Sequence, residues 1–99
     1  MKKNEIVKIL KNERLYLHKT FGIKRIAIFG SFARGEQHRD SDVDIFVELE
    51  RPIGFKFIEL CEHLEKKLGR KADVLTPGGM AGIRLKSIAR DIKRNMVYV

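Results

Sequence analysis

Two aspartates stand at the start of a short apolar segment, and their spacing suits them to binding a cation. Asp42 and Asp44 alternate with Val43 and Ile45, a pattern typical of a β-strand whose apolar side faces the core. Residues i and i+2 of a strand project from the same face, so the two carboxylates are expected side by side. Like charges at that spacing repel each other unless a cation lies between them, and carboxylate oxygens are ligands for Mg²⁺. The pair indicates a metal site, with a polar strand end that faces water as the alternative.

A third aspartate, Asp73, stands in the apolar run Ala72–Thr76, where a carboxylate without a partner is costly. If this run forms a strand beside the one that carries Asp44, all three carboxylates share one face of a sheet. Three aspartates can hold two Mg²⁺ ions, which bridge a nucleoside triphosphate and an attacking hydroxyl in an in-line displacement. The alternative for Asp73 is an exposed position at the start of a strand.

A glycine-flanked turn follows the apolar run 25–29 and has features of a phosphate-binding turn. Gly30 has no Cβ, so the backbone can turn sharply and come close to a ligand. The Ser31 hydroxyl and the N–H groups behind it can point at a phosphate, especially if residues 31–35 form the first turn of a helix. A plain Gly-Ser turn is the alternative.

Two residues near this turn have both a functional and a structural interpretation. The Arg34 guanidinium can neutralise charge on phosphate oxygens, or it can form a salt bridge with Glu36 or Asp40. Ser41 can take part in binding a nucleotide, or it can cap the turn before the carboxylate strand.

Hydrophobic spacing predicts the elements that position these residues. We expect a helix, two strands, a helix, a strand, a helix and a strand over residues 4–20, 25–29, 43–48, 52–68, 72–76, 85–92 and 96–99. Asn4 is expected to cap the first helix, and the buried face of the second is expected to consist of Phe57, Cys61, Leu64 and Leu68. The order predicts a single α/β domain, of the α+β type, over residues 1–99.

Composition excludes several classes of protein. Of the 99 residues, 43% are hydrophobic and 34% are charged, which excludes global disorder. No run approaches the ~18 apolar residues of a membrane span, and the single cysteine, Cys61, excludes an internal disulfide or a cysteine-based zinc site. These features favour a cytoplasmic protein. The net charge of +8 is concentrated in residues 1–25 and 84–94, which suits nucleic-acid binding or simply keeps the protein soluble.

Taken together, the motifs resemble those of a known family. Gly30-Ser31-x-Ala33-Arg34-Gly35, a short polar loop, Ser41-Asp42-x-Asp44 and a later strand aspartate are similar to the minimal nucleotidyltransferases of the DNA polymerase β superfamily. The resemblance covers nearly the whole chain. It implies a small mixed β-sheet flanked by helices, with the polymerase-β type of nucleotidyltransferase fold.

The resemblance also implies roles for the motif residues. Gly30 and Ser31 would hold the triphosphate, with Arg34 and Ser41 nearby. Asp42 and Asp44 would bind two Mg²⁺ ions, and Asp73 would ligate the catalytic metal and take the proton from the incoming hydroxyl.

Minimal nucleotidyltransferases of this kind are often antitoxins of HEPN ribonuclease toxins, and they transfer AMP from ATP to a tyrosine of the toxin. The resemblance therefore implies a protein adenylyltransferase with a HEPN partner. Two alternatives stay open: an antitoxin that neutralises its partner by binding alone, and a small basic nucleic-acid-binding domain. The carboxylates disfavour the second alternative, because they repel phosphates unless metal ions intervene.

Overall fold

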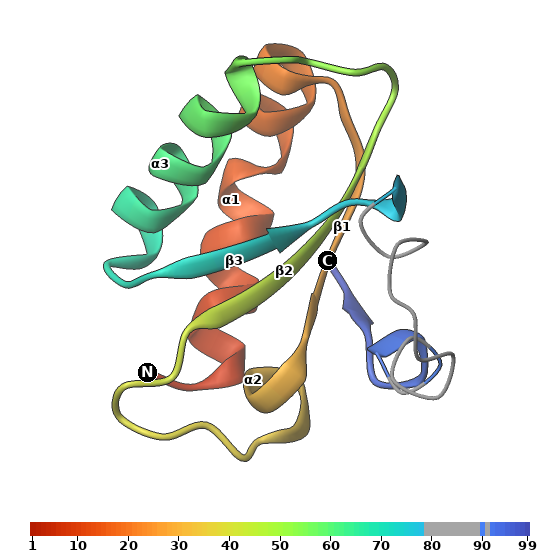
Figure 1. Cartoon of the computed structure of the whole chain (residues 1–99). Helices are drawn as coiled ribbons and strands as arrows, with labels where there is room; N and C mark the ends of the chain where they lie inside the picture. The colour runs from red at the N-terminus through yellow and green to blue at the C-terminus, as the bar shows by residue number, and fades with distance from the viewer. Residues whose placement is uncertain (79–89, 91) are drawn as a thin grey trace.

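The computed structural model describes residues 1–78, 90 and 92–99. Within these ranges, four strands form one mixed sheet in the order β3-β2-β1-β4 (Figure 1). β1 is antiparallel to both β2 and β4, whereas β3 is parallel to β2. The elements are α1 (Lys3–Phe21), β1 (Ile23–Phe29), α2 (Gly30–Arg34), β2 (Val43–Leu49), α3 (Lys56–Leu68), β3 (Ala72–Leu75) and β4 (Val97–Tyr98). The predicted mixed α/β architecture is confirmed.

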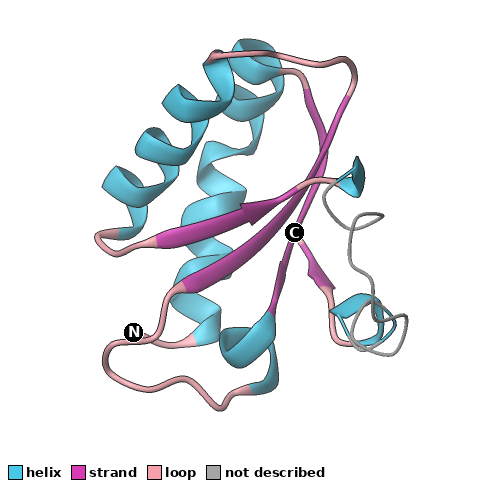
Figure 2. Ribbon diagram, in the orientation of Figure 1, coloured by secondary structure: helices cyan, strands magenta, loops and turns pink. Residues whose placement is uncertain are grey.

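The two long helices, α1 and α3, lie on one face of the sheet (Figure 2). Alternate residues of β1 and β2 point toward these helices and form the main core with the apolar sides of α1 and α3. The intervening strand residues point to the opposite face, which we call the open face because neither of the two long helices covers it. On that face a smaller buried cluster consists of Ala27, Phe29 and Phe46, with Leu75, Ile92 and Met96 packed against it.

Helix α1 differs slightly from the predicted 4–20 in its bounds. It begins at Lys3, so Asn4 lies inside the helix and is not its cap. The Lys2 backbone N–H donates to Glu5 Oε1 at 3.2 Å, which satisfies an amide at the helix start without a cap from Asn4. The helix ends at Gly22, whose φ of 70° allows its N–H to reach the carbonyl oxygen of His18 at 3.0 Å.

The buried face of α3 is shifted from the predicted one. Leu60, Leu64 and Leu68 are buried, whereas Cys61 is only half-buried. The three leucines recur at every fourth position and lie along one side of the helix, which leaves Cys61 at its margin. The prediction that Cys61 belongs to the buried face was wrong. Burial is nevertheless sufficient to raise the pKa of the Cys61 thiol, with the nearby Glu65 carboxylate adding to the effect.

Helix α3 also starts later than the predicted residue 52. Gly54, with φ of 57°, lies in a turn that precedes the helix, and the first helical amide, that of Lys56, donates to the Ile53 carbonyl at 3.1 Å. The chain therefore passes through a turn in which one residue, Gly54, has a left-handed backbone conformation before the helix begins.

The C-terminal predictions are tested in part. Leu85, Ile88 and Ala89, predicted to lie on a final helix, fall outside the described residues. The predicted strand 96–99 is present as β4, whose Tyr98 and Val97 pair with Ala27 and Ile28 of β1. No helix in the described ranges is long and apolar enough to cross a membrane.

Candidate active site

Asp44 and Asp73, two of the three aspartates predicted to be catalytic, lie at one edge of the sheet. β1 ends at this edge, and β2 and β3 begin there, because β2 runs antiparallel to β1 and parallel to β3. Phe29 pairs with Asp44, and Asp44 pairs with Asp73. Because directly paired residues on neighbouring strands share a face, Asp44 and Asp73 lie side by side. That face is the open face, since Val43 and its alternate neighbours fill the helix-side core.

Asp44 is the most perturbed carboxylate at this edge. Its side chain is half-buried, and burial raises the pKa of the Asp44 carboxyl. The neighbouring charges of Asp73 and Asp42 raise this pKa further, whereas the Arg34 guanidinium acts in the opposite direction. Within the described residues, the carboxylates of Asp42 and Asp73 thus lie near that of Asp44, and neighbouring carboxylates of this kind can favour a bound cation.

Gly30 is required by the position of the Asp44 carboxylate. A Cβ placed on Gly30 would collide with that carboxylate, lying 2.9 Å from its Cγ and closer still to its Oδ2. The backbone there also has φ of 69°, a conformation that side chains other than hydrogen disfavour. The sequence predicted a close approach of a ligand to Gly30, and the structure shows that the Asp44 carboxylate lies close to this glycine.

Asp42 lies just outside the strand that carries Asp44, whereas the sequence predicted that both aspartates belong to one strand. Both Asp42 and Asp73 are exposed, and Asp42 precedes the first residue of β2. No three acidic, histidine or cysteine side chains of the described residues gather closely enough to hold a metal ion. Mg²⁺ in phosphoryl-transfer sites is usually bound by one or two carboxylates together with water and substrate phosphates. An open set of carboxylates fits that mode of binding.

The predicted phosphate turn is a short helix. Gly30 is the first residue of α2, and Ser31 is half-buried in its first turn. The Arg34 Nε donates to Glu36 Oε2 at 3.0 Å, and both side chains are exposed. The structure therefore contains the salt bridge that was the alternative for Arg34, and an exposed pair of this kind is weak enough to exchange for a phosphate.

Ser41 has a structural role in the loop before β2. Its Oγ accepts a hydrogen bond from the His38 backbone N–H at 2.7 Å, as the capping alternative predicted. The Ser41 carbonyl accepts a further hydrogen bond, at 3.1 Å, from Arg70 Nη1. Arg70 was not identified from the sequence, because no local pattern links it to a loop that lies so far back in the chain.

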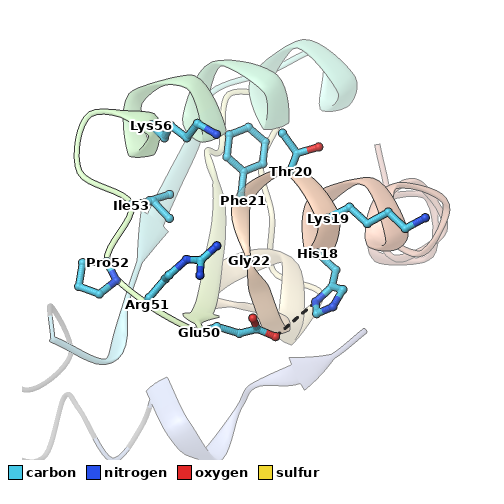
Figure 3. A pocket seen from close by; sticks show the side chains of 10 residues that line it. All are labelled: His18, Lys19, Thr20, Phe21, Gly22, Glu50, Arg51, Pro52, Ile53 and Lys56. Atoms are coloured by element: carbon cyan, nitrogen blue, oxygen red, sulfur yellow. Dashed lines mark ion pairs between the residues drawn. The ribbon is translucent and has the colours of Figure 1, made fainter.

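A hollow of about 500 Å³ lies at the opposite edge of the sheet, where β2 ends (Figure 3). Its lining includes Arg51 from the β2–α3 segment, Lys56 from the start of α3 and His18 from α1. The His18 Nδ1 lies 3.0 Å from the Ile23 carbonyl oxygen and 3.9 Å from Glu50 Oε1. The sheet separates this hollow from the edge where the aspartates lie, so it is distinct from the candidate active site.

The sequence matches the family described as nucleotidyltransferase domain over residues 4–99. The chain belongs to the nucleotidyltransferase family. It is 42% identical over 96 residues to the protein adenylyltransferase MntA of Thermococcus cleftensis, with 96% of this chain and 93% of that protein covered. The prediction of a minimal nucleotidyltransferase is confirmed, and the protein is an enzyme of this class.

Solved structures support the nucleotidyltransferase fold. A candidate minimal nucleotidyltransferase matches with a TM-score of 0.73 at 28% identity, covering 98% of this chain and 95% of the other. A complex of the tri-AMPylated HEPN toxin of Shewanella oneidensis with an MNT antitoxin matches with a TM-score of 0.56 at 18% identity. That match covers 97% of this nucleotidyltransferase but only 66% of the other chain. At that identity it shows a shared fold alone.

Proposed function

We propose that residues 1–99 act as one minimal nucleotidyltransferase domain that transfers AMP from ATP to a hydroxyl of a partner protein. The acceptor is a tyrosine of a HEPN ribonuclease toxin, and the nucleotidyltransferase is its antitoxin. The observation that carries the proposal is the row of Asp44 and Asp73 on the open face, with Asp42 close enough to raise the pKa of Asp44. The relationship to MntA and the shared fold with an MNT antitoxin support it.

The proposed roles follow the positions of the residues. Three of these residues, Gly30, Ser31 and Arg34, lie in α2, and Ser41 lies in the loop before β2. In this proposal all four bind the phosphates of ATP. Arg34 exchanges its exposed partner Glu36 for a phosphate oxygen. Ser41 acts through the loop that its hydroxyl shapes.

Two Mg²⁺ ions would be held by Asp42, Asp44 and Asp73 and would supply charge neutralisation for the phosphates. The direct pairing of Asp44 with Asp73 on neighbouring strands supports this assignment. In the transfer, the acceptor hydroxyl oxygen forms a bond to the α-phosphorus of ATP, and the bond from that phosphorus to the bridging oxygen breaks. Pyrophosphate leaves, and the hydroxyl proton passes to Asp73.

The test is intact mass spectrometry of a HEPN protein encoded beside this chain, after incubation with the nucleotidyltransferase, ATP and Mg²⁺. We expect a gain of one or more AMP units that is lost with the Asp42→Asn/Asp44→Asn double variant. Glu48→Gln is the matched control, because it removes a carboxylate charge from the same face at the other end of β2.

Two outcomes would contradict the proposal in different ways. A stable complex without any mass gain, and toxin neutralisation that survives in the double variant, would show an antitoxin that acts by binding alone. The second outcome is binding to RNA or DNA that weakens steeply with salt and is unchanged by the aspartate substitutions. It would show a nucleic-acid-binding domain.

A further inference from the structure

Arg70 contacts two of the segments that form the candidate site. It lies in the turn between α3 and β3, three residues before Asp73. Its Nη1 donates a hydrogen bond to the Ser41 carbonyl oxygen at 3.1 Å. Its Cζ lies 5.4 Å from the centroid of the Phe32 ring in α2, within the range of a cation–π interaction.

The turn that carries Arg70 is fixed to the sheet and to α3. The Ala72 N–H donates to Glu65 Oε2 of α3 at 3.0 Å. The Lys71 carbonyl accepts a hydrogen bond from the Val43 N–H at 3.0 Å, at the first residue of β2. Arg70 therefore extends from a rigid base, and its planar guanidinium can hold a partner in a defined direction.

The segment held by Arg70 has few other attachments. Residues 38–41 are stabilised internally by the His38 N–H to Ser41 Oγ bond and by the Ser41 N–H to His38 carbonyl bond. Among the described residues, the Arg70 guanidinium supplies the hydrogen bond that ties this segment to the rest of the protein. The next residue along the chain is Asp42, which is exposed.

We propose that Arg70 is a positioning residue for the metal and phosphate site. By holding the Ser41 carbonyl it fixes the backbone from which Asp42 projects, and by stacking on Phe32 it keeps that backbone in register with the turn at Gly30. This inference rests on the proposed metal-dependent transfer. Groups that orient metal ligands without touching the metal commonly change metal affinity by about 10–100-fold when they are removed.

The test compares Arg70→Met with Arg39→Met. Both substitutions remove one positive charge and keep an unbranched side chain, but Arg39 is exposed in the same loop and makes no such contact within the described residues. Binding of Mn²⁺ in the presence of ATP is measured by electron paramagnetic resonance, without any acceptor protein. We expect Arg70→Met to raise the half-saturating Mn²⁺ concentration about 10-fold and Arg39→Met to leave it unchanged.

Amide hydrogen exchange supplies a second readout. Exchange at residues 38–42 is expected to accelerate in Arg70→Met and to match the wild type in Arg39→Met. Arg70→Lys keeps the charge and a donor but loses the planar guanidinium over the Phe32 ring. Its half-saturating Mn²⁺ concentration is therefore expected to lie between that of the wild type and that of Arg70→Met. If Arg70→Met does not fold, Arg70→Lys decides the question, and wild-type Mn²⁺ affinity in that variant would overturn the inference.

The outcomes separate this inference from the proposed function. Loss of Mn²⁺ binding in Asp42→Asn together with wild-type binding in Arg70→Met overturns the role of Arg70 alone. Equal Mn²⁺ binding by the wild type and the Asp42→Asn/Asp44→Asn variant overturns the proposed function, and the positioning role with it. A lower melting temperature with unchanged half-saturation would show that Arg70 only stabilises the fold.

Discussion

The open face of the sheet has two charged ends that are built in opposite ways. At one end, Arg25 donates two hydrogen bonds of 2.6 Å to the two carboxylate oxygens of Glu48 and lies over the Tyr98 ring. Hydrogen bonding from Arg25 lowers the pKa of Glu48. At the other end, Asp44 and Asp73 stand side by side, and burial together with the neighbouring carboxylates raises the pKa of Asp44.

Strand β2 contributes to both ends, with β1 supplying Arg25 at one end and β3 supplying Asp73 at the other. An apolar row of Ala27, Phe46 and Leu75 lies between them. One end satisfies its charges within the chain. The other gathers like charges at the point where three segments begin or end. This difference shows that the geometry of the sheet does not by itself force carboxylates to lie together, because the same sheet places an arginine beside a glutamate at its other end. A polar end on this sheet can be satisfied within the chain, so the contrast is consistent with the proposed binding of a cation and of phosphates at the end that carries Asp44 and Asp73.

The largest expected effect comes from removing one carboxylate charge at each end. Asp73→Asn should lower AMP transfer by about 10³-fold, because an amide cannot accept the proton of the attacking hydroxyl. Glu48→Gln should leave transfer unchanged. Initial rates with radiolabelled ATP measure both. Equal losses in the two variants would remove the functional distinction between the ends.

The second comparison uses two glycines with nearly the same backbone conformation. Gly30 and Gly69 have φ of 69° and 70°, but only at Gly30 would a Cβ collide with a side chain, that of Asp44. Gly69→Ala should cost about 1–2 kcal/mol of unfolding free energy and keep activity. Gly30→Ala should cost at least as much stability and should also abolish most transfer, because it displaces the Asp44 carboxylate.

Urea unfolding and transfer rates on the same preparations test this pair. Because the backbone penalty is shared, any difference in activity reports the contact with Asp44. Full activity in folded Gly30→Ala would show that the carboxylate has room to move without loss of function.

A third effect concerns stability at the end of the sheet that carries Asp44 and Asp73. Asp44→Asn should raise the melting temperature of the ligand-free protein by a few degrees at neutral pH, because an amide is not opposed by burial or by Asp73 and Asp42. The folded-state pKa of Asp44 is raised above its unfolded value, so its charge lowers stability only at higher pH. The gain from the amide should therefore fade as the pH falls through the folded pKa and disappear below the ordinary carboxyl pKa.

Calorimetric melting curves across this pH range check the sign. Addition of ATP and Mg²⁺ should reverse the order, because the ligands stabilise the wild type and not the variant. A lower melting temperature for Asp44→Asn at neutral pH would mean that the carboxylate is already satisfied by the protein.

The smallest effect is expected at the opposite end. Glu48→Gln should lower the melting temperature only slightly, since the Arg25 side chain is exposed, that of Glu48 is only partly buried, and ion pairs near the surface contribute little. Increasing the salt concentration should reduce the difference between this variant and the wild type. Melting curves at low and high NaCl measure it, and a large loss that salt does not change would place the pair among the main supports of the fold.

Much of this fold could be predicted because its signals are local. The strand at Val43 follows from the alternation of apolar and polar residues, and the ends of α1 and α3 follow from Gly22 and Gly69. The placement of Asp73 beside Asp44 followed from the assumption that two apolar strands are neighbours, which the observed register confirms. The catalytic roles of these residues stay predictions.

The remaining features depend on contacts between distant parts of the chain. The fit of Gly30 against Asp44 and the hydrogen bond from Arg70 to Ser41 connect separate elements, and no periodicity reports them. The choice of Leu60 over Cys61 for the buried face of α3 depends on the rotation of that helix against the sheet. The spacing of apolar residues along the sequence does not determine this rotation, since Phe57, Cys61 and Leu64 are also spaced to lie along one side of a helix.

The mixed topology of the sheet has a consequence for how the chain folds. β1 and β2 form an antiparallel pair joined through residues 30–42, whereas the parallel pairing of β2 with β3 requires α3 to cross over between them. Pairing between strands that lie farther apart in sequence is generally the slower event. Gly30, Asp42 and Asp44 can therefore come together early, while Asp73 arrives only when α3 has docked. A partly folded chain has an incomplete site. During refolding, transferase activity should therefore appear later than the β1–β2 pair.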